Sequence, residues 1–191
     1  MSIKPWKILR SQYLVRDRWL SLRADTCRTD QGILVDPFYI LEKKDWAHVL
    51  AFDAAGRILV VRQYRHGSGV VSTELPCGMI DSSDGTPLAA AKRELLEETG
   101  CVADDYETVT AVYANSARQT NRVHCFVGFN TRKVAEPRQE ASENIESEFV
   151  SLSDVFQMID TGAFAQSHHI ASLYQGLRKV GKLKPDPARP E

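Results

Sequence analysis

Short runs of alternating or continuous apolar residues dominate the first part of the chain and predict β-strands. Three runs near the N-terminus, separated by polar residues, predict a small antiparallel arrangement; they cover residues 7–15, 19–27 and 33–41. Further strands are predicted at residues 48–52, 58–63, 70–75, 106–113 and 123–129. The turn residues at positions 53–56 separate two of these apolar runs.

Three segments have helical rather than strand periodicity. The first is Pro87–Thr99, because Thr86 suits the N-cap, Pro87 the first helical position and Gly100 the C-terminal stop. Two more helices are predicted at residues 153–162 and 167–180. Many strands with a few helices predict an α+β fold in which helices flank a mixed sheet.

Composition and charge narrow the class of protein. The chain has 191 residues, of which 43% are hydrophobic and 26% charged, as in an ordinary globular protein. The formal net charge of -1 does not indicate a nucleic acid or an anionic membrane as partner, so an anionic substrate must meet a local group of cations. No run of about 18 apolar residues predicts a membrane span. The N-terminus lacks the apolar core of a signal peptide, and the four scattered cysteines form no C-x-x-C pair, which together predict a cytoplasmic protein.

A group of carboxylates lies near the end of the first predicted helix. Glu94, Glu97 and Glu98 are at positions i, i+3 and i+4 and therefore share one helix face. Like charges at this spacing cost about 0.2–0.5 kcal/mol per pair, and the negative helix end adds to that cost. A bound Mg²⁺ or Mn²⁺ ion would offset both. A solvated acidic face is the alternative, but Arg93 and the preceding loop after Gly78 favour a metal site.

The segment GMIDSSDGTPLAAAKRELLEETGC, residues 78–101, resembles the box of the Nudix hydrolases, Gly-x5-Glu-x7-Arg-Glu-U-x-Glu-Glu-x-Gly-U, in which U is a bulky apolar residue. Asp84 stands where the family has glutamate, and the spacing from Asp84 to Arg93 is one residue longer than the pattern. The resemblance implies a Nudix-type α/β/α sandwich. It also implies that Glu94, Glu97 and Glu98 bind metal, that Arg93 orients a glutamate, and that water attacks a phosphorus atom.

The residues before the box, VVRQYRHG at 60–67 and ELPCG at 74–78, are similar to the ADP-ribose and nucleoside-diphosphate-sugar pyrophosphatase branch. This similarity implies that the backbone carbonyl of Cys77 binds metal, that Arg65 or Arg62 contacts the diphosphate, and that Glu74 lies near the terminal sugar. Strand alternation places the two arginines on opposite faces, and we prefer Arg65 for the substrate.

Other substrate and catalytic candidates lie outside the box. In this branch the catalytic carboxylate often comes from a loop before a late strand, which here makes Glu143 and Glu140 the candidates for general base. Asn121 and Arg122 are candidate substrate contacts, with the start of a strand as the alternative. Trp46 and Trp19 are candidates for stacking on a base, with a core or interface role as the alternative. The neighbouring His168 and His169 point in different directions on a helix, which favours surface or packing roles over a metal site.

The resemblance also implies the organisation of the chain. We expect a β extension at residues 1–42 that forms a homodimer, a catalytic Nudix domain at 43–181 and a flexible tail at 182–191. The expected activity is metal-dependent hydrolysis of ADP-ribose or a related nucleoside diphosphate sugar to a nucleoside monophosphate and a sugar phosphate. The alternatives are hydrolysis of dinucleoside polyphosphates or nucleoside triphosphates, and a non-catalytic sensor of nucleotide sugars.

Overall fold

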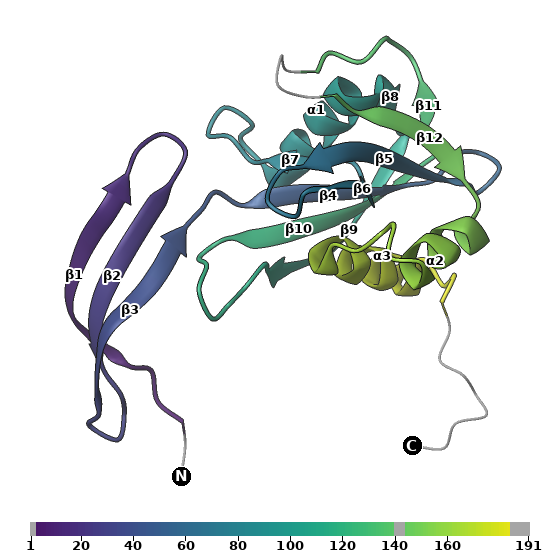
Figure 1. The fold of residues 1–191 in the computed structure, drawn as a ribbon. Helices are drawn as coiled ribbons and strands as arrows, with labels where there is room; N and C mark the ends of the chain where they lie inside the picture. The colour runs from purple at the N-terminus through teal and green to yellow at the C-terminus, as the bar shows by residue number, and fades with distance from the viewer. Residues whose placement is uncertain (1–2, 140–143, 184–191) are drawn as a thin grey trace, which may run out of the picture. The chain divides into compact units, whose positions relative to one another are not determined.

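The structure is a computed structural model that describes residues 3–139 and 144–183 (Figure 1). The chain forms two compact units. One contains the chain up to Asp45 together with Tyr113–Arg122, and the other contains Trp46–Val112 and the chain from Val123 onward.

The first unit is built around an antiparallel sheet with strand order β1-β2-β3. Its strands are β1 (Lys7–Arg16), β2 (Ser21–Arg28) and β3 (Leu34–Glu42), close to the three predicted runs. Every residue of β1 is exposed. The backbone amide of Leu41 donates to the carbonyl of Arg118, so the segment between β9 and β10 is attached to the end of β3.

The larger unit contains a four-stranded mixed sheet with strand order β7-β4-β10-β9. Its central strands β4 (Trp46–Ala51) and β10 (Arg122–Phe129) are parallel, whereas β7 (Cys77–Met79) pairs with β4 antiparallel. Strand β9 (Asp105–Tyr113) lies at the edge. The register pairs His48 with Cys77 across β4 and β7.

Three further antiparallel pairings complete the strands of this unit. β5 (Ile58–Arg65) lies between β12 (Glu146–Val150) and β6 (Val70–Glu74). The short strands β8 (Cys101–Val102) and β11 (Arg132–Lys133) form a separate pair. The short strands β7, β8 and β11 were not predicted, because two or three residues show no periodicity.

Helix α1 spans Pro87–Thr99, as predicted. The Thr86 hydroxyl accepts a hydrogen bond from the Ala89 amide, and Gly100 ends the helix with φ +70°. Helix α2 (Leu152–Asp160) begins one residue earlier than predicted, because Ser151 and Asp154 form a reciprocal capping box. Helix α3 covers Ser167–Lys179, almost the whole predicted segment.

Strand β4 is buried on both faces, which explains the layered arrangement of the larger unit. On one face, Ala47, Val49 and Ala51 share an apolar cluster with α1 residues such as Leu95. On the other, Leu50 and Phe52 pack with Leu173 and Leu177 of α3. Figure 1 shows α1 on one side of the strands and α2 and α3 on the other. The predicted α+β fold, with helices on both faces of a mixed sheet and additional N-terminal antiparallel strands, is therefore confirmed (Figure 1).

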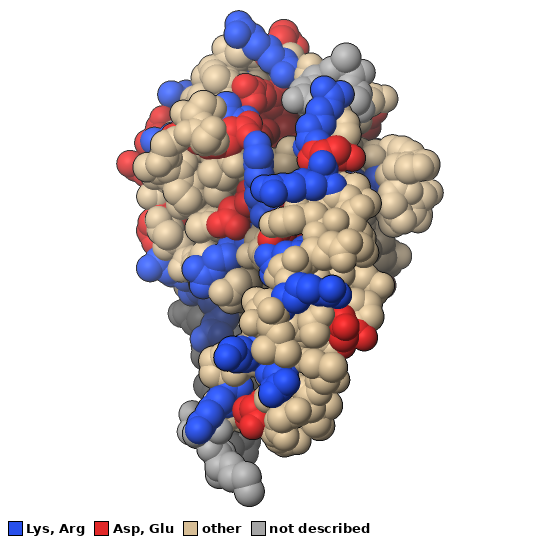
Figure 2. Space-filling model, turned by 90° about the vertical axis from the view of Figure 1, so that its left-hand side faces the viewer, with Lys and Arg blue, Asp and Glu red and all other residues tan. Residues whose placement is uncertain are grey.

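The surface agrees with the nearly neutral net charge. Basic and acidic side chains both occur on the face shown in Figure 2, with uncharged surface between them. Within residues 3–139 and 144–183, no helix has the length and apolar character needed to cross a membrane.

Leu95 provides a test of the packing of α1. Its side chain is fully buried, whereas that of the adjacent Leu96 is 38% exposed. We expect Leu95→Ala to lower the free energy of unfolding by about 2–5 kcal/mol, since it removes buried methyl groups and leaves a cavity. The matched variant Leu96→Ala should change it by about 0.5 kcal/mol or less. Urea denaturation measures both, and equal effects would contradict the packing described for α1.

Candidate functional site

The site begins where β7 leads through a loop into α1. Gly78 has no side chain, and the Glu94 carboxylate occupies the space beside its Cα atom. A Cβ atom on Gly78 would lie 1.9 Å from Cδ of Glu94, which is closer than two non-bonded atoms approach. Glycine at position 78 therefore lets a carboxylate of α1 lie directly against the β7 backbone.

The guanidinium of Arg93 joins the loop to the carboxylates of α1. It donates two hydrogen bonds to Asp84, at 2.8 and 3.0 Å, and one to the Met79 carbonyl at 3.1 Å. It also donates to Glu94 at 2.8 Å and to Glu97 at 2.9 Å. One arginine thus fixes the loop backbone and two of the predicted metal ligands at the same time.

Asp84 anchors the loop in the place where the family pattern has glutamate. Its carboxylate receives the forked hydrogen bonds of Arg93 and also accepts from the Asp81 amide at 2.7 Å. The hydrogen bonds from Arg93 lower the pKa of Asp84 to about 2. The shorter side chain and the longer loop therefore still place a charged carboxylate on Arg93.

Glu98, near the C-terminal end of α1, connects this helix to β7. Its carboxylate accepts a hydrogen bond from the Cys77 amide at 2.9 Å, and the residue is only 5% exposed. The neighbouring Glu94 and Glu97 side chains are 17% and 44% exposed. The three glutamates thus span the range from buried to solvent-accessible.

The chemistry of these donors suits a hard divalent cation. Three carboxylates, those of Asp84, Glu94 and Glu97, contact the guanidinium of Arg93, and a fourth, that of Glu98, accepts from the Cys77 amide beside Gly78. The group therefore carries more negative charge than Arg93 neutralises, and its side-chain donor atoms are carboxylate oxygens. Mg²⁺ and Mn²⁺ prefer such ligands, so the residues present fit the metal that the sequence predicts.

The two arginines of β5 lie on opposite faces, as strand alternation predicts. Arg65 is partly buried and donates two hydrogen bonds to Glu74, of which the one from Nε is 2.9 Å long. Arg62 is exposed and lies 3.6 Å from a Glu146 carboxylate oxygen.

Glu74 is fully buried, and its carboxylate is occupied by protein partners. The carboxylate binds Arg65 and accepts a hydrogen bond from the side-chain amide of Gln166 at 2.6 Å. It also lies 3.3 Å from Nε2 of His169. Burial alone would raise the pKa of Glu74, but the hydrogen bonds from Arg65 and Gln166 lower it. The geometry shows Glu74 holding Arg65 in place.

The remaining candidates have diverse surroundings. The Trp46 ring lies 5.2 Å from the His168 ring, measured between centroids. Asn121 is buried, and within the described residues neither atom of its side-chain amide has a hydrogen-bond partner. The Arg122 guanidinium lies over the Tyr113 ring. Glu140 and Glu143 lie outside the described residues.

Sequence reasoning missed the contribution of α3 to this region. His169 is buried, as a packing role would require, but its Nδ1 also accepts a hydrogen bond from the Leu75 amide. Gln166 contacts Glu74 across 92 positions of sequence. The adjacent histidines were the only local signal, and they did not identify which strand α3 would contact.

Comparison with known proteins places this site in a family. Residues 43–173 match the model described as the NUDIX domain, and residues 6–41 match the nucleoside diphosphate sugar hydrolase N-terminal domain. The chain is also similar to a solved structure described as an ADP compounds hydrolase. That match has a TM-score of 0.82 and 16% identity, and covers 96% of this chain and 100% of the other.

The chain is also similar in sequence to three pyrophosphatases. An ADP-ribose pyrophosphatase of Mycobacterium tuberculosis is 27% identical over 75% of this chain and 69% of its own length. An ADP-ribose pyrophosphatase of Bacillus subtilis is 30% identical over 59% of this chain, which spans 61% of that protein. A GDP-mannose pyrophosphatase of Pectobacterium atrosepticum is 23% identical over 86% of this chain and 90% of its own length. Because the NUDIX domain model covers well over half of the sequence, the chain belongs to the Nudix hydrolase family and is a Nudix pyrophosphohydrolase.

Proposed function

We propose that this enzyme hydrolyses the diphosphate linkage of ADP-ribose or a related nucleoside diphosphate sugar, giving a nucleoside monophosphate and a sugar phosphate. The observation that carries the proposal is the arrangement of three α1 glutamates: Glu94 and Glu97 lie on Arg93, and Glu98 accepts from the Cys77 amide. The matching N-terminal domain and the names of the relatives support a nucleotide sugar as substrate.

The family generally uses divalent metals, and we propose Mg²⁺, with Mn²⁺ as a substitute. Glu94, Glu97, Glu98 and the backbone carbonyl of Cys77 would hold the metal, and Arg93 keeps the carboxylates in place. When bound, the metal supplies positive charge that acidifies a water molecule and neutralises charge on the phosphate oxygens. Glu140 and Glu143 remain the proposed sources of the general base.

For the substrate we propose that Arg65 contacts the diphosphate. Its guanidinium is held by the buried Glu74, so little side-chain freedom remains to be lost on binding. Glu74 then acts through Arg65 as a positioning residue. Arg62, Trp46, Asn121 and Arg122 are the further proposed contacts, with Trp46 stacking on the base.

We also propose that residues 1–42 form the interface of a homodimer, that residues 43–181 form the catalytic domain, and that the enzyme is cytoplasmic. Strand β1 exposes apolar side chains that a partner could cover, including Ile8, Leu14 and Val15. Light scattering of the purified protein should give a mass near twice 21.4 kDa. A single-chain mass at micromolar concentration would remove the dimer from the proposal.

A substrate panel tests the activity. We expect Mg²⁺-dependent release of phosphate from ADP-ribose or another nucleotide sugar when a phosphatase is coupled to the reaction. GDP-mannose is included because the relative with that activity covers most of this chain. Preferential hydrolysis of dinucleoside polyphosphates or nucleoside triphosphates would favour another Nudix activity. Tight binding of a nucleotide sugar with no turnover would favour a sensor.

The variant Glu97→Gln, assayed with the best substrate of the panel, tests the proposed metal ligands. Mutation of a residue that only hydrogen-bonds to a metal ligand typically lowers activity or metal affinity by about 10–100-fold. The loss of a ligand itself should therefore lower kcat by at least about 100-fold. The control Glu107→Gln makes the same chemical change at an exposed position of β9 and should leave kcat unchanged. Nearly full activity of folded Glu97→Gln would show that Glu97 is not a ligand.

The Asp84–Arg93 pair predicts a pH dependence of stability. Arg93 lowers the pKa of Asp84 from 3.8 to about 2 in the folded protein, so the ionised carboxylate stabilises the fold. This contribution is fully present above pH 3.8 and is lost as the pH falls toward about 2. The difference in unfolding free energy between wild type and Asp84→Asn should therefore be largest near neutral pH and should shrink over that range. A difference independent of pH in urea denaturation would contradict the ion pair.

A further inference from the structure

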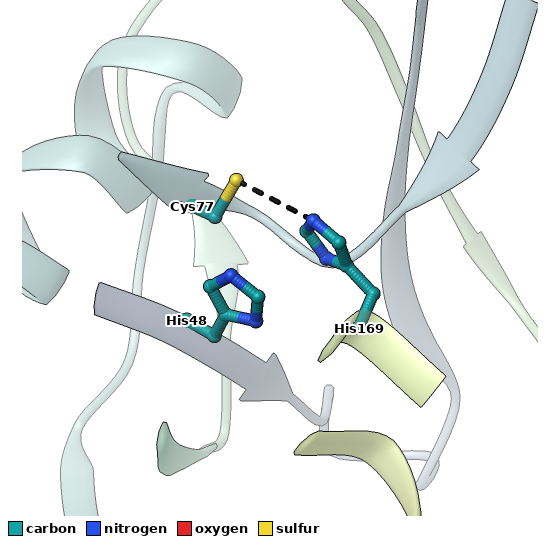
Figure 3. Close-up of side chains that lie close together, drawn as sticks. All are labelled: His48, Cys77 and His169. Carbon is teal, nitrogen blue, oxygen red and sulfur yellow. Dashed lines mark hydrogen bonds between the residues drawn. The ribbon is translucent and has the colours of Figure 1, made fainter. Parts of the chain in front are cut away.

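A group of histidine and cysteine side chains lies on the α3 side of the sheet, apart from the carboxylates. His48 of β4, Cys77 of β7 and His169 of α3 face one another there (Figure 3). One ligand atom from each residue lies within 4.8 Å of the other two. Cys77 Sγ is 3.9 Å from His169 Nε2, and the two imidazole rings are stacked with centroids 4.1 Å apart.

One ring nitrogen of His48 has no hydrogen-bond partner among the described residues. Its Nδ1 is hydrogen-bonded to the Ser172 hydroxyl at 3.1 Å, whereas its Nε2 is buried and has no partner within residues 3–139 and 144–183. Burial lowers the pKa of His48 well below its usual value, so the ring is neutral. A proton on Nδ1, donated to Ser172, leaves the Nε2 lone pair free, which is how metal-binding histidines are commonly oriented.

His169 has the opposite orientation. Its Nδ1 accepts a hydrogen bond from the Leu75 amide at 3.2 Å, which places the proton of the neutral ring on Nε2. That N–H group lies near Cys77 Sγ and 3.3 Å from a Glu74 carboxylate oxygen. His169 therefore offers sulfur a hydrogen-bond donor and does not offer a third lone pair.

From this geometry we infer that Cys77 Sγ and His48 Nε2 bind a soft monovalent metal ion, with Cu⁺ as the natural occupant. Cu⁺ replaces the thiol proton: the S–H bond breaks, an S–Cu bond forms and one proton leaves to solvent. The imidazole remains neutral, so the charge of the buried group is the same before and after binding. The N–H group of His169 donates to the metal-bound sulfur.

Charge and ligand type both favour this ion over the alternatives. Thiolate selects soft ions such as Cu⁺ and Zn²⁺, whereas Mg²⁺ prefers the oxygen atoms of the carboxylate group. A divalent ion with one thiolate would add a net positive charge to the buried group, beside a Glu74 carboxylate that Arg65 already pairs, and would require the lone pair that His169 lacks.

The test is a competition experiment with metal-free, reduced protein under anaerobic conditions. Cu⁺ is supplied as its coloured bicinchoninate complex, and loss of colour reports transfer to the protein. We expect the wild type to take up one Cu⁺ per chain and Cys77→Ser to take up none. Cys101→Ser removes another buried thiol outside the group and should behave as wild type. Equal uptake by Cys77→Ser and wild type would overturn the inference.

Two histidine variants separate the roles of the rings. Asn at position 48 can still donate to Ser172 through its amide but lacks an atom at Nε2, so His48→Asn should lose Cu⁺ uptake. Asn at position 169 can still accept from the Leu75 amide, so His169→Asn should retain uptake with weaker affinity. Loss of uptake in His169→Asn equal to that in Cys77→Ser would overturn the two-ligand assignment.

Two measurements on the wild type need no substitution and guard against misfolded variants. X-ray absorption of the Cu⁺-loaded protein should show one sulfur and one nitrogen ligand, and a shell of sulfur alone would contradict the site. A Zn²⁺ indicator should retain its metal in the presence of protein, whereas tight uptake of one Zn²⁺ per chain would overturn the assignment to a monovalent ion. These binding results are independent of whether the enzyme hydrolyses nucleotide sugars.

Discussion

The guanidinium of Arg93 holds together groups that would otherwise repel one another or move apart. It reaches Asp84 and Met79 in the loop and Glu94 and Glu97 on the helix, all at 2.8–3.1 Å. Because Gly78 leaves space for the Glu94 carboxylate, these charges lie directly against β7. The proposed metal site, the loop conformation and the position of α1 therefore depend on the same side chain.

Local signals predicted α1 and its charged face. Thr86, Pro87 and Gly100 each act within one turn of their own position, so the helix boundaries were confirmed residue by residue. The strands β1 to β3 were likewise predicted to within a few positions, because polar segments such as residues 16–18 separate the apolar runs.

Contacts across the fold could not be predicted in this way. Glu74 is a predicted sugar contact, and the structure adds protein partners that the sequence did not indicate, because it buries the carboxylate between Arg65, Gln166 and His169. Two of these partners come from α3 or the residue that precedes it, about 90 residues later in the sequence. A pattern read over a few residues cannot show which helix packs on which strand, and the same limit applies to His48 and Cys77.

Cys77 contacts both of the proposed metal sites. Its backbone amide donates to Glu98 in the oxygen-rich group, and its thiol faces the imidazoles of His48 and His169. The oxygen donors of the glutamates and the sulfur and nitrogen donors of the histidine and cysteine group therefore meet at the same residue, Cys77 of β7. A crystal structure of the protein with Mn²⁺ tests the central claim most directly, because the anomalous signal locates the ion. The account predicts a peak within bonding distance of Glu94, Glu97 and Glu98 oxygen atoms. A crystal grown at saturating Mn²⁺ that shows no peak at these carboxylates would contradict it.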